Sequence, residues 1–531
     1  MDRQYPTTHV DLPARARGLS RRTLLRGAAV TGLGGAAAAL LGRTGRIAHA
    51  GPATAQTAAW QQFDDTVQAA MQTFDMVGAA VAVVNADGIV HSNTFGVRNL
   101  TSRAPVTPNT LFRVGSTTKS MTALLVATFV DEGLLGWDQP VVDVWPDFRA
   151  PNAALTSSLR VRDLMGMATG LGEGWFALHY DYPTALQLMQ GFAYLPVLTP
   201  PHTEWYYNNA VYAAAGYMPP LRQGVAADDL QSAYTRLMQE RVFGPAGMVG
   251  AHIGDDPRPY TADYATGYNP DFVEGIAVGN ATPIGSVGPA GGGLVNLTDM
   301  AAYVRLQLRR GVSSAGTHVV TSRNLEECWR PQIVVPVGPA DGPDVMSAGY
   351  GMGWIDYTYT NNVRLVWHTG FWDGFGAFIG FFPEKDLGLV VLMNTLATSS
   401  ESFYHYVLNL LLERRFSLNR GVNETVVAAY QDAAGARTAL AAQARPVDAG
   451  VIAPFLGDYE HGDRLAYDAA GVLRLYAGGR AMRVLALPDG SYVLASGQAV
   501  GLPLRLVRDQ MGTPVMELEG TETVRWLSGP P

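Results

Sequence analysis

The feature that most constrains the fold is the placement of the strand-forming segments. They lie near both ends of a long region whose interior contains few of them. Apolar, β-branched runs at 77–84 and 89–95 flank an Asp87-Gly88 turn, a pattern typical of a β-hairpin. Similar runs return only at 363–369, 377–382 and 387–393. Residues 131–310 are mostly helical or loop-like in pattern. We therefore predict an α+β fold, an antiparallel sheet flanked by helices, with a helical region inserted in its middle.

The chain changes character near residue 420. Residues 424–445 are Ala-rich and helical in pattern, and Pro446 ends that helix. Short alternating stretches follow at 473–476, 483–487, 492–494, 504–507 and 515–518. They predict a small all-β C-terminal domain. The expected organisation is an export signal at 1–50, a main domain at 51–420, a helical linker at 421–449 and the β domain at 450–531.

The first fifty residues differ in composition from the rest. They hold eight arginines and two aspartates, with no lysine or glutamate. The pair Arg21-Arg22, a mild Gly/Ala/Leu segment at 27–41 and Ala48-His49-Ala50 resemble a twin-arginine export signal with its cleavage site. A second small-x-small site at 53–55 leaves the cut position open. We expect a periplasmic or extracellular protein with no stable membrane span after cleavage, because the apolar segment is short and glycine-rich.

Composition also narrows the partners. Beyond residue 50 the chain carries 30 basic and 44 acidic residues, a net charge of −14. Such an acidic body argues against a nucleic-acid partner and favours a small-molecule or peptide substrate. The single cysteine, Cys328, excludes an intrachain disulfide. No His/Cys cluster has metal-ligand spacing, so we expect neither a metal nor another cofactor.

One of only two lysines in the chain lies three residues after a serine. Lys385 is the other lysine, and there are 36 arginines. Since a guanidinium does not give up its proton, a lysine at 119 points to an amine that must titrate. At spacing i, i+3 on a helix, Lys119 could take the hydroxyl proton of Ser116. The apolar stretch 121–130, which stops at Gly133, predicts a buried helix whose first turn would favour an oxyanion at the serine.

Because serine is common, Ser-x-x-Lys alone is a weak signal, and its partners must be sought elsewhere. In the segment 204–209, Tyr207 could share the proton transfers, and Asn209 could orient a substrate carbonyl or the lysine. In 367–370, at the end of a predicted strand, free edge backbone could hold an extended substrate. The nearby His202 is expected to be structural.

Taken in order, these three motifs resemble those of the serine β-lactamase and penicillin-binding-protein family. The branch is that of class C β-lactamases, D-alanyl-D-alanine carboxypeptidases, D-aminopeptidases and related esterases, and the resemblance covers roughly 60–411. Supporting similarities lie at 161–164, 288–294 and 374–394. The C-terminal piece, including 455–459, is similar to barrel-like domains appended to some of these hydrolases. Such a domain either covers the mouth of the active site or only stabilises the chain.

The resemblance implies a role for each matched position. Ser116 would be acylated, with Lys119 as its neighbouring base and Tyr207 as a third catalytic residue. The backbone N–H groups of Ser116 and Phe371 would form the oxyanion hole. The predicted substrate-binding residues are Asn209, His368, Thr369, Gly370 and Phe371.

Departures from the family pattern bear on the substrate. His368 stands where true β-lactamases usually have lysine, and a histidine holds less positive charge at neutral pH for a substrate carboxylate. Recognition of penicillins is therefore less assured than acyl transfer. Phe371 and Trp372, with Trp175 and Phe176 of the inserted region, either line an apolar pocket or serve in ordinary packing.

These observations predict an exported serine hydrolase that forms an acyl-enzyme. The expected substrate is an ester or a D-amino-acid peptide or amide, with a β-lactam as the less favoured choice. Two alternatives remain open: a protein that binds or senses peptidoglycan fragments or β-lactams without turnover, and an acyltransferase with the same nucleophile. Substrate identity, oligomeric state and the role of the C-terminal domain are left open by the sequence.

Overall fold

The computed structural model describes residues 52–172, 184–279, 282–338, 341–395, 398–477, 480–497, 499–518 and 523–528. The chain divides into two units, Met1–Phe63 and Asp64–Pro531. Helix α1 (Pro52–Thr73) spans the boundary, and the sheet, the remaining helices and the C-terminal barrel belong to the second unit. The predicted export signal, 1–50, lies outside the described residues. None of the described helices is long and apolar enough to cross a membrane.

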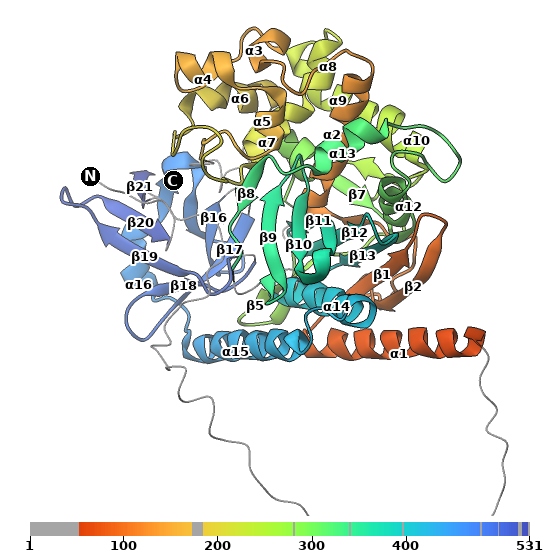
Figure 1. The fold of residues 1–531 in the computed structure, drawn as a ribbon. Coiled ribbons are helices and arrows are strands. Elements are labelled where there is room, and N and C mark those ends of the chain that lie inside the picture. The colour runs from red at the N-terminus through yellow and green to blue at the C-terminus, as the bar shows by residue number, and fades with distance from the viewer. Residues whose placement is uncertain are drawn as a thin grey trace, which may run out of the picture. The chain divides into compact units, whose positions relative to one another are not determined.

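An antiparallel sheet forms the centre of the second unit (Figure 1). Its strand order is β2-β1-β13-β12-β11-β10-β9-β8. Strand β1 (Gly78–Val84) pairs with β2 (Ile89–Gly96) on one side and with β13 (Leu387–Met393) on the other. This pairing confirms the prediction that strands from the two ends of the family-like region meet in one sheet. The other strands are β8 (Ile333–Val335), β9 (Val345–Tyr350), β10 (Ile355–Tyr359), β11 (Arg364–Trp372) and β12 (Phe375–Phe382).

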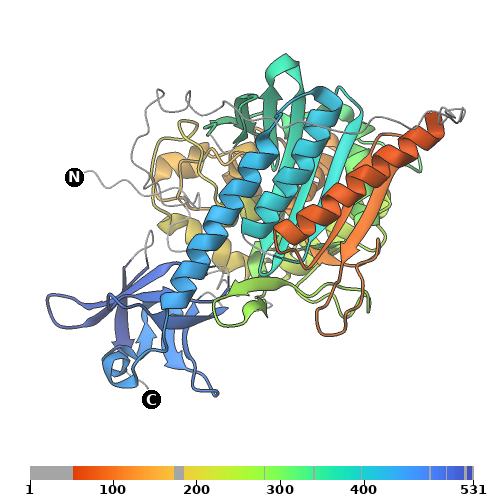
Figure 2. The same cartoon turned by 90° about the horizontal axis from the view of Figure 1, so that it is seen from below.

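Both faces of the central strands are covered, which explains their continuously apolar sequences. Every residue of β12 and β13 is buried. Helix α12 (Leu297–Leu308) packs on one face, where a Cβ added at Gly388 would meet Val304. Helix α14 (Thr398–Phe416) covers the other face, and Figure 2 shows it side by side with α15 (Val422–Gln443).

Strands β8, β9 and β10 were missing from the sequence prediction. Glycines and polar residues interrupt their apolar pattern, and two of the six residues of β9 are exposed. Strand β10 pairs with the buried β11, β9 with β10 and β8 with β9, and this sheet pairing stabilises them, a tertiary effect that a local pattern does not report.

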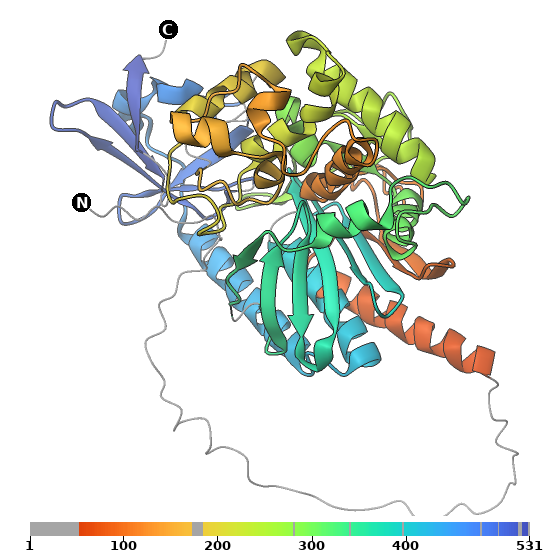
Figure 3. The same cartoon turned by 45° about the horizontal axis from the view of Figure 1, so that its top comes forward.

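The helices from the middle of the chain form a cluster of their own, orange to yellow-green in Figure 3. Three of them bear on the site: α2 (Thr118–Asp131), α5 (Val161–Met165) and α7 (Asn209–Gly216). They contact one another through α7. Helix α2 matches the predicted buried helix, and Gly133, with φ of +68°, follows its end.

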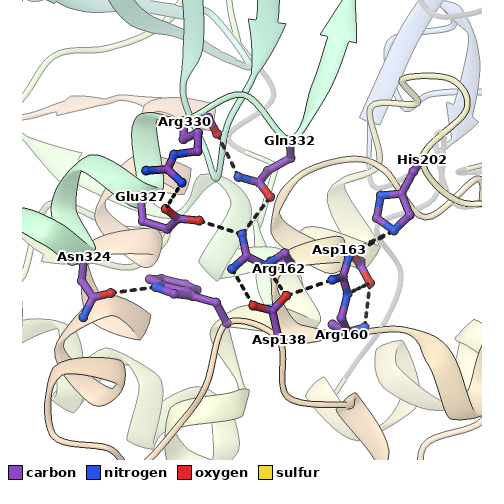
Figure 4. Close-up of polar contacts among 10 residues, drawn as sticks. Asp138, Arg160, Arg162, Asp163, His202, Asn324, Glu327, Arg330 and Gln332 are labelled. Carbon is purple, nitrogen blue, oxygen red and sulfur yellow. Dashed lines mark hydrogen bonds and ion pairs between the residues drawn. The ribbon is translucent and has the colours of Figure 1, made fainter.

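A network of charged side chains holds α5 to α13 (Ser322–Trp329) (Figure 4). The guanidinium of Arg162 donates to Glu327 at 2.7 Å, to Gln332 at 3.1 Å and to Asp138 at 2.9 Å. The residues at 161–164, singled out in the sequence, thus serve to fix the helix that packs against α7.

The C-terminal residues form a closed antiparallel barrel. Its strands are β14 (Gly457–Tyr459), β15 (Arg464–Tyr467), β16 (Leu473–Ala477), β17 (Arg480–Ala486), β18 (Tyr492–Leu494), β19 (Pro503–Arg508), β20 (Pro514–Leu518) and β21 (Thr523–Ser528). Tyr459, Leu475 and Met516 are among its fully buried core residues. The predicted all-β fold of this part is confirmed, while the domain boundaries at 421 and 450 stay predictions.

Candidate active site

Ser116 lies on a short 3₁₀ turn, η1 (Gly115–Thr117), directly before α2. The sequence placed it in the first turn of the α-helix itself, and the structure places it one turn earlier. Gly115 has φ of +49°, a backbone conformation that a residue with a Cβ rarely adopts. The serine side chain is partly exposed, whereas Lys119 is fully buried.

The ammonium group of Lys119 contacts three acceptors. Its Nζ lies 2.9 Å from Ser116 Oγ, 2.7 Å from Asn209 Oδ1 and 2.9 Å from the carbonyl oxygen of Ala290. The two carbonyl oxygens can only accept, so in the neutral amine they take both N–H bonds and leave the lone pair facing Ser116. A proton can therefore move between Oγ and Nζ while the other two contacts stay in place.

Tyr207 and Asn209 come from the start of α7. Tyr207 donates its hydroxyl proton to Ser116 Oγ at 2.8 Å, and Lys119 Nζ lies 4.7 Å from the centre of the Tyr207 ring. Asn208, between them, caps the helix by accepting the N–H of Val211 at 2.9 Å. The cap fixes the chain so that the residues on either side of it face the serine.

Two glycines let strand β11 approach the serine turn closely. A Cβ added at Gly370 would lie 1.9 Å from the carbonyl oxygen of Val114 and 2.7 Å from the backbone nitrogen of Ser116. A Cβ at Gly115 would lie 2.7 Å from the backbone nitrogen of Phe371. The backbones of 114–117 and 370–371 are thus in direct contact, which brings the amides of Ser116 and Phe371 together as a candidate oxyanion hole.

The edge of β11 beside the serine is open. Strand β10 pairs with β11 only as far as Trp367, so residues 368–372 have no strand partner on that side within the described structure. Thr369 and Phe371 on this stretch are partly exposed. An extended substrate can add to such an edge through backbone hydrogen bonds.

His368 is buried behind Tyr207 and does not line the cavity at Ser116. Its Nδ1 donates to the carbonyl oxygen of Thr369 at 2.5 Å, so Nε2 accepts the hydroxyl proton of Tyr350 at 3.1 Å. Burial, with the positive charge of Lys119, lowers the pKa of His368 to about 3. The imidazole is therefore neutral at pH 7 and supplies no cation to a substrate.

A small cavity of about 60 Å³ opens beside Ser116. Its walls are Ser116, Asn209, Ile284, Val287, Ala290, Gly291, Phe371 and Trp372. Phe371 and Trp372 thus line a pocket, whereas Trp175 and Phe176 lie outside the described residues. His202 lies 3.2 Å from Arg160, away from the serine, in the network of Figure 4.

Several residues that shape the site were not predicted. Tyr350 and Tyr212 are fully buried, and Tyr212 donates to the backbone carbonyl of Lys119 at 2.7 Å. Ala290 contributes its backbone oxygen, which no side-chain pattern reveals. The one available signal was the glycine-rich run at 288–294, whose lack of side chains brings that backbone close to α2.

The family model described as "Beta-lactamase" matches residues 63–413, more than half of the chain. The chain belongs to the β-lactamase family. Its Ser-x-x-Lys geometry is thus that of a β-lactamase-family serine hydrolase, an enzyme class that acts on small-molecule and peptide substrates.

Individual relatives agree with this assignment. A protein named unguisins hydrolase ungD', from Aspergillus campestris, is 26% identical over 382 residues, which span 68% of this chain and 67% of the relative. Penicillin-binding protein 4 of Amycolatopsis lactamdurans is 26% identical over 421 residues, 76% of this chain and 97% of the relative. Others are named beta-lactamase and D-aminopeptidase.

A solved structure, the octameric penicillin-binding protein homologue from Pyrococcus abyssi, has the same fold. The TM-score is 0.57 at 20% identity, over 88% of this chain and 99% of that one. The predicted fold class is therefore confirmed.

Proposed function

We propose that this β-lactamase-family enzyme hydrolyses an ester or a D-amino-acid peptide or amide through an acyl-enzyme on Ser116. The observation that carries the proposal is the pair of contacts to Ser116 Oγ, from Lys119 at 2.9 Å and from Tyr207 at 2.8 Å. Both groups can move protons, and the lysine is held by two fixed acceptors.

The proposed reaction begins with attack of Ser116 Oγ on the substrate carbonyl while its proton passes to Lys119 Nζ. The new oxyanion accepts hydrogen bonds from the amides of Ser116 and Phe371. As the bond to the leaving group breaks, Tyr207 passes the proton on to the departing oxygen or nitrogen. Water then attacks the acyl carbon and gives up a proton, which passes through Lys119 or Tyr207 to Ser116 Oγ as the bond between Oγ and the acyl carbon breaks.

The state of His368 supports esters and peptides over β-lactams. A neutral, buried imidazole at this position cannot pair with the carboxylate of a penicillin as the lysine of true β-lactamases does. The relatives named D-aminopeptidase and unguisins hydrolase support an amide or peptide substrate.

A fluorophosphonate probe and a short-chain ester test the proposal. The wild-type protein should be labelled and should turn the ester over continuously, and Ser116→Ala should do neither. Equal activity in the variant overturns the nucleophile assignment. A stoichiometric burst without turnover would favour the binding or sensing alternative, and product formation that rises with an added amine or alcohol would favour an acyltransferase.

We further propose that the enzyme acts outside the cytoplasm after twin-arginine export. The residues 20–26, Ser-Arg-Arg-Thr-Leu-Leu-Arg, support this location. Replacing Arg21-Arg22 with two lysines should retain the protein in the cytoplasm. Unchanged export of that variant, measured by fractionation, would contradict the proposal.

A further inference from the structure

Arg480, at the start of barrel strand β17, reaches the wall of the active-site cavity. Its guanidinium carbon lies 5.9 Å from the ring centre of Trp372, and Trp372 lines the cavity beside Ser116. The Trp372 ring is fixed, because its Nε1 donates to the carbonyl oxygen of Thr282 at 3.0 Å. The barrel thus places a cation against a rigid aromatic side chain of the site.

Polar contacts also fix β17 against the catalytic part of the chain. Arg483 on the same strand donates to Glu274 at 3.2 Å and lies 3.8 Å from Asp271. Beside it, the backbone N–H of Phe272 donates to the carbonyl oxygen of Ala495 at 2.9 Å. These contacts hold the strand that carries Arg480 in register with the loop beside the site.

Arg480 lacks the acidic partner that three other barrel arginines have. Arg464, Arg474 and Arg483 each lie within 4 Å of an aspartate or glutamate. Among the described residues, no carboxylate pairs with Arg480, and its Nε is buried without a hydrogen-bond partner. A buried N–H donor of a charged group that has no hydrogen-bond partner costs free energy. An anionic ligand would supply the missing acceptor.

The side of the site on which Arg480 lies decides which part of a substrate it meets. Tyr207, which passes the proton to the leaving group in the proposed reaction, is not among the residues that line the cavity. In the proposed reaction, the acyl part of a substrate on Ser116 would occupy this cavity, against Phe371 and Trp372. Arg480 lies beside that wall.

We propose that Arg480 binds a carboxylate at the far end of the acyl group, so that the preferred substrate is an acyl donor with a remote negative charge. We expect a single negative charge on the acyl group, because Arg113 already donates to the carbonyl oxygens of Thr282 and Asp255 and does not offer a second cation. A planar guanidinium suits a carboxylate geometrically. This inference rests on the proposed acyl-enzyme at Ser116.

The kinetic test uses 4-nitrophenyl monoesters of adipic, pimelic and suberic acid, each beside its ω-methyl ester. For at least one chain length, wild-type kcat/KM should be about tenfold or more higher for the free acid, the effect of a charged hydrogen bond. Arg480→Gln should remove that preference and leave the methyl esters unchanged, whereas Arg480→Lys should retain part of it. The exposed barrel arginine at 505 supplies the control, Arg505→Gln, which should behave as wild type.

Two outcomes overturn the inference: no preference for any free acid in wild type, or an equal loss on acids and methyl esters in Arg480→Gln. The second outcome would mean that Arg480 only joins the barrel to Trp372.

A binding experiment tests the carboxylate site independently of the proposed hydrolysis. Monoamides of the same three diacids and their neutral diamides are titrated into the Ser116→Ala protein by calorimetry. At least one monoamide should bind about tenfold tighter than its diamide, and adding Arg480→Gln should abolish the difference. If wild type turns over no ester but this difference is found, the hydrolysis proposal fails and the carboxylate site stands. Equal binding of acid and diamide refutes the site.

Discussion

The hydroxyl of Tyr350 donates to Nε2 of His368 across 3.1 Å, and the Tyr350 ring lies edge-on to the ring of Tyr207 at 6.4 Å. Burial keeps His368 neutral, and because Nδ1 of the same imidazole donates to a backbone carbonyl, Nε2 is the nitrogen that accepts. The pair packs behind the tyrosine that contacts the nucleophile and helps to hold its ring.

The buried His368 should make the fold acid-sensitive. Its pKa is about 3 in the folded protein against an ordinary 6.5, so between these values the unfolded chain binds a proton that the folded chain refuses. Stability from this group is complete above pH 6.5 and falls as the pH drops, by about 2 kcal/mol at pH 5. Urea unfolding at pH 7 and pH 5 should show this loss in wild type and a much smaller one in His368→Gln. The exposed His318 gives the control, since His318→Gln should keep the wild-type slope.

Lys119→Arg should lower kcat/KM for an ester by about 10²- to 10⁴-fold, because a guanidinium keeps its proton and cannot act as the base. Circular dichroism should show an intact fold. The matched control is the other lysine of the chain, the exposed Lys385, whose replacement by arginine should leave the rate unchanged. Near-normal turnover by Lys119→Arg would show that charge alone is needed at this position.

Tyr207→Phe should lower kcat by roughly 10²-fold or more, because it removes the hydroxyl that contacts Ser116 Oγ at 2.8 Å. Steady-state kinetics with an ester measure the effect. Its neighbour provides the comparison: Tyr206 donates to Glu204 at 2.6 Å on the surface, so Tyr206→Phe should be silent. Equal rates in the two variants would remove Tyr207 from the proton pathway.

Gly370→Ala should both destabilise the protein, by about 1–3 kcal/mol, and reduce acylation by roughly 10²-fold. Its new Cβ would overlap the carbonyl oxygen of Val114 and push the amides of Ser116 and Phe371 apart. Thermal unfolding and the rate of fluorophosphonate labelling report the two effects separately. Gly88, in the hairpin turn, has open space around it, so Gly88→Ala should change neither. Fast labelling by Gly370→Ala would argue against the proposed oxyanion hole.

The parts of the fold that could be predicted are those whose burial shows in the local pattern of apolar residues. Strands β1, β12 and β13 and the helix α2 are largely apolar and buried, and the Asp87-Gly88 turn marks the hairpin from β1 to β2. Strands β8 to β10 were missed because their stability comes from pairing within the sheet, β10 with β11, β9 with β10 and β8 with β9. The short middle strands β3 (Phe112–Arg113), β4 (His252–Ile253) and β7 (Gly293–Val295) were missed for the same reason.

The sequence by itself determined which residue types meet: a serine and a lysine three positions apart must share one face of a turn, because helical geometry is local. Only the tertiary structure decided their surroundings. The Ala290 carbonyl that holds Lys119, the Tyr350 behind His368 and the Arg480 beside Trp372 all come from distant segments. Such contacts depend on how sheet, inserted helices and barrel pack together, and no periodicity along the chain encodes which backbone oxygen or guanidinium arrives at a given point.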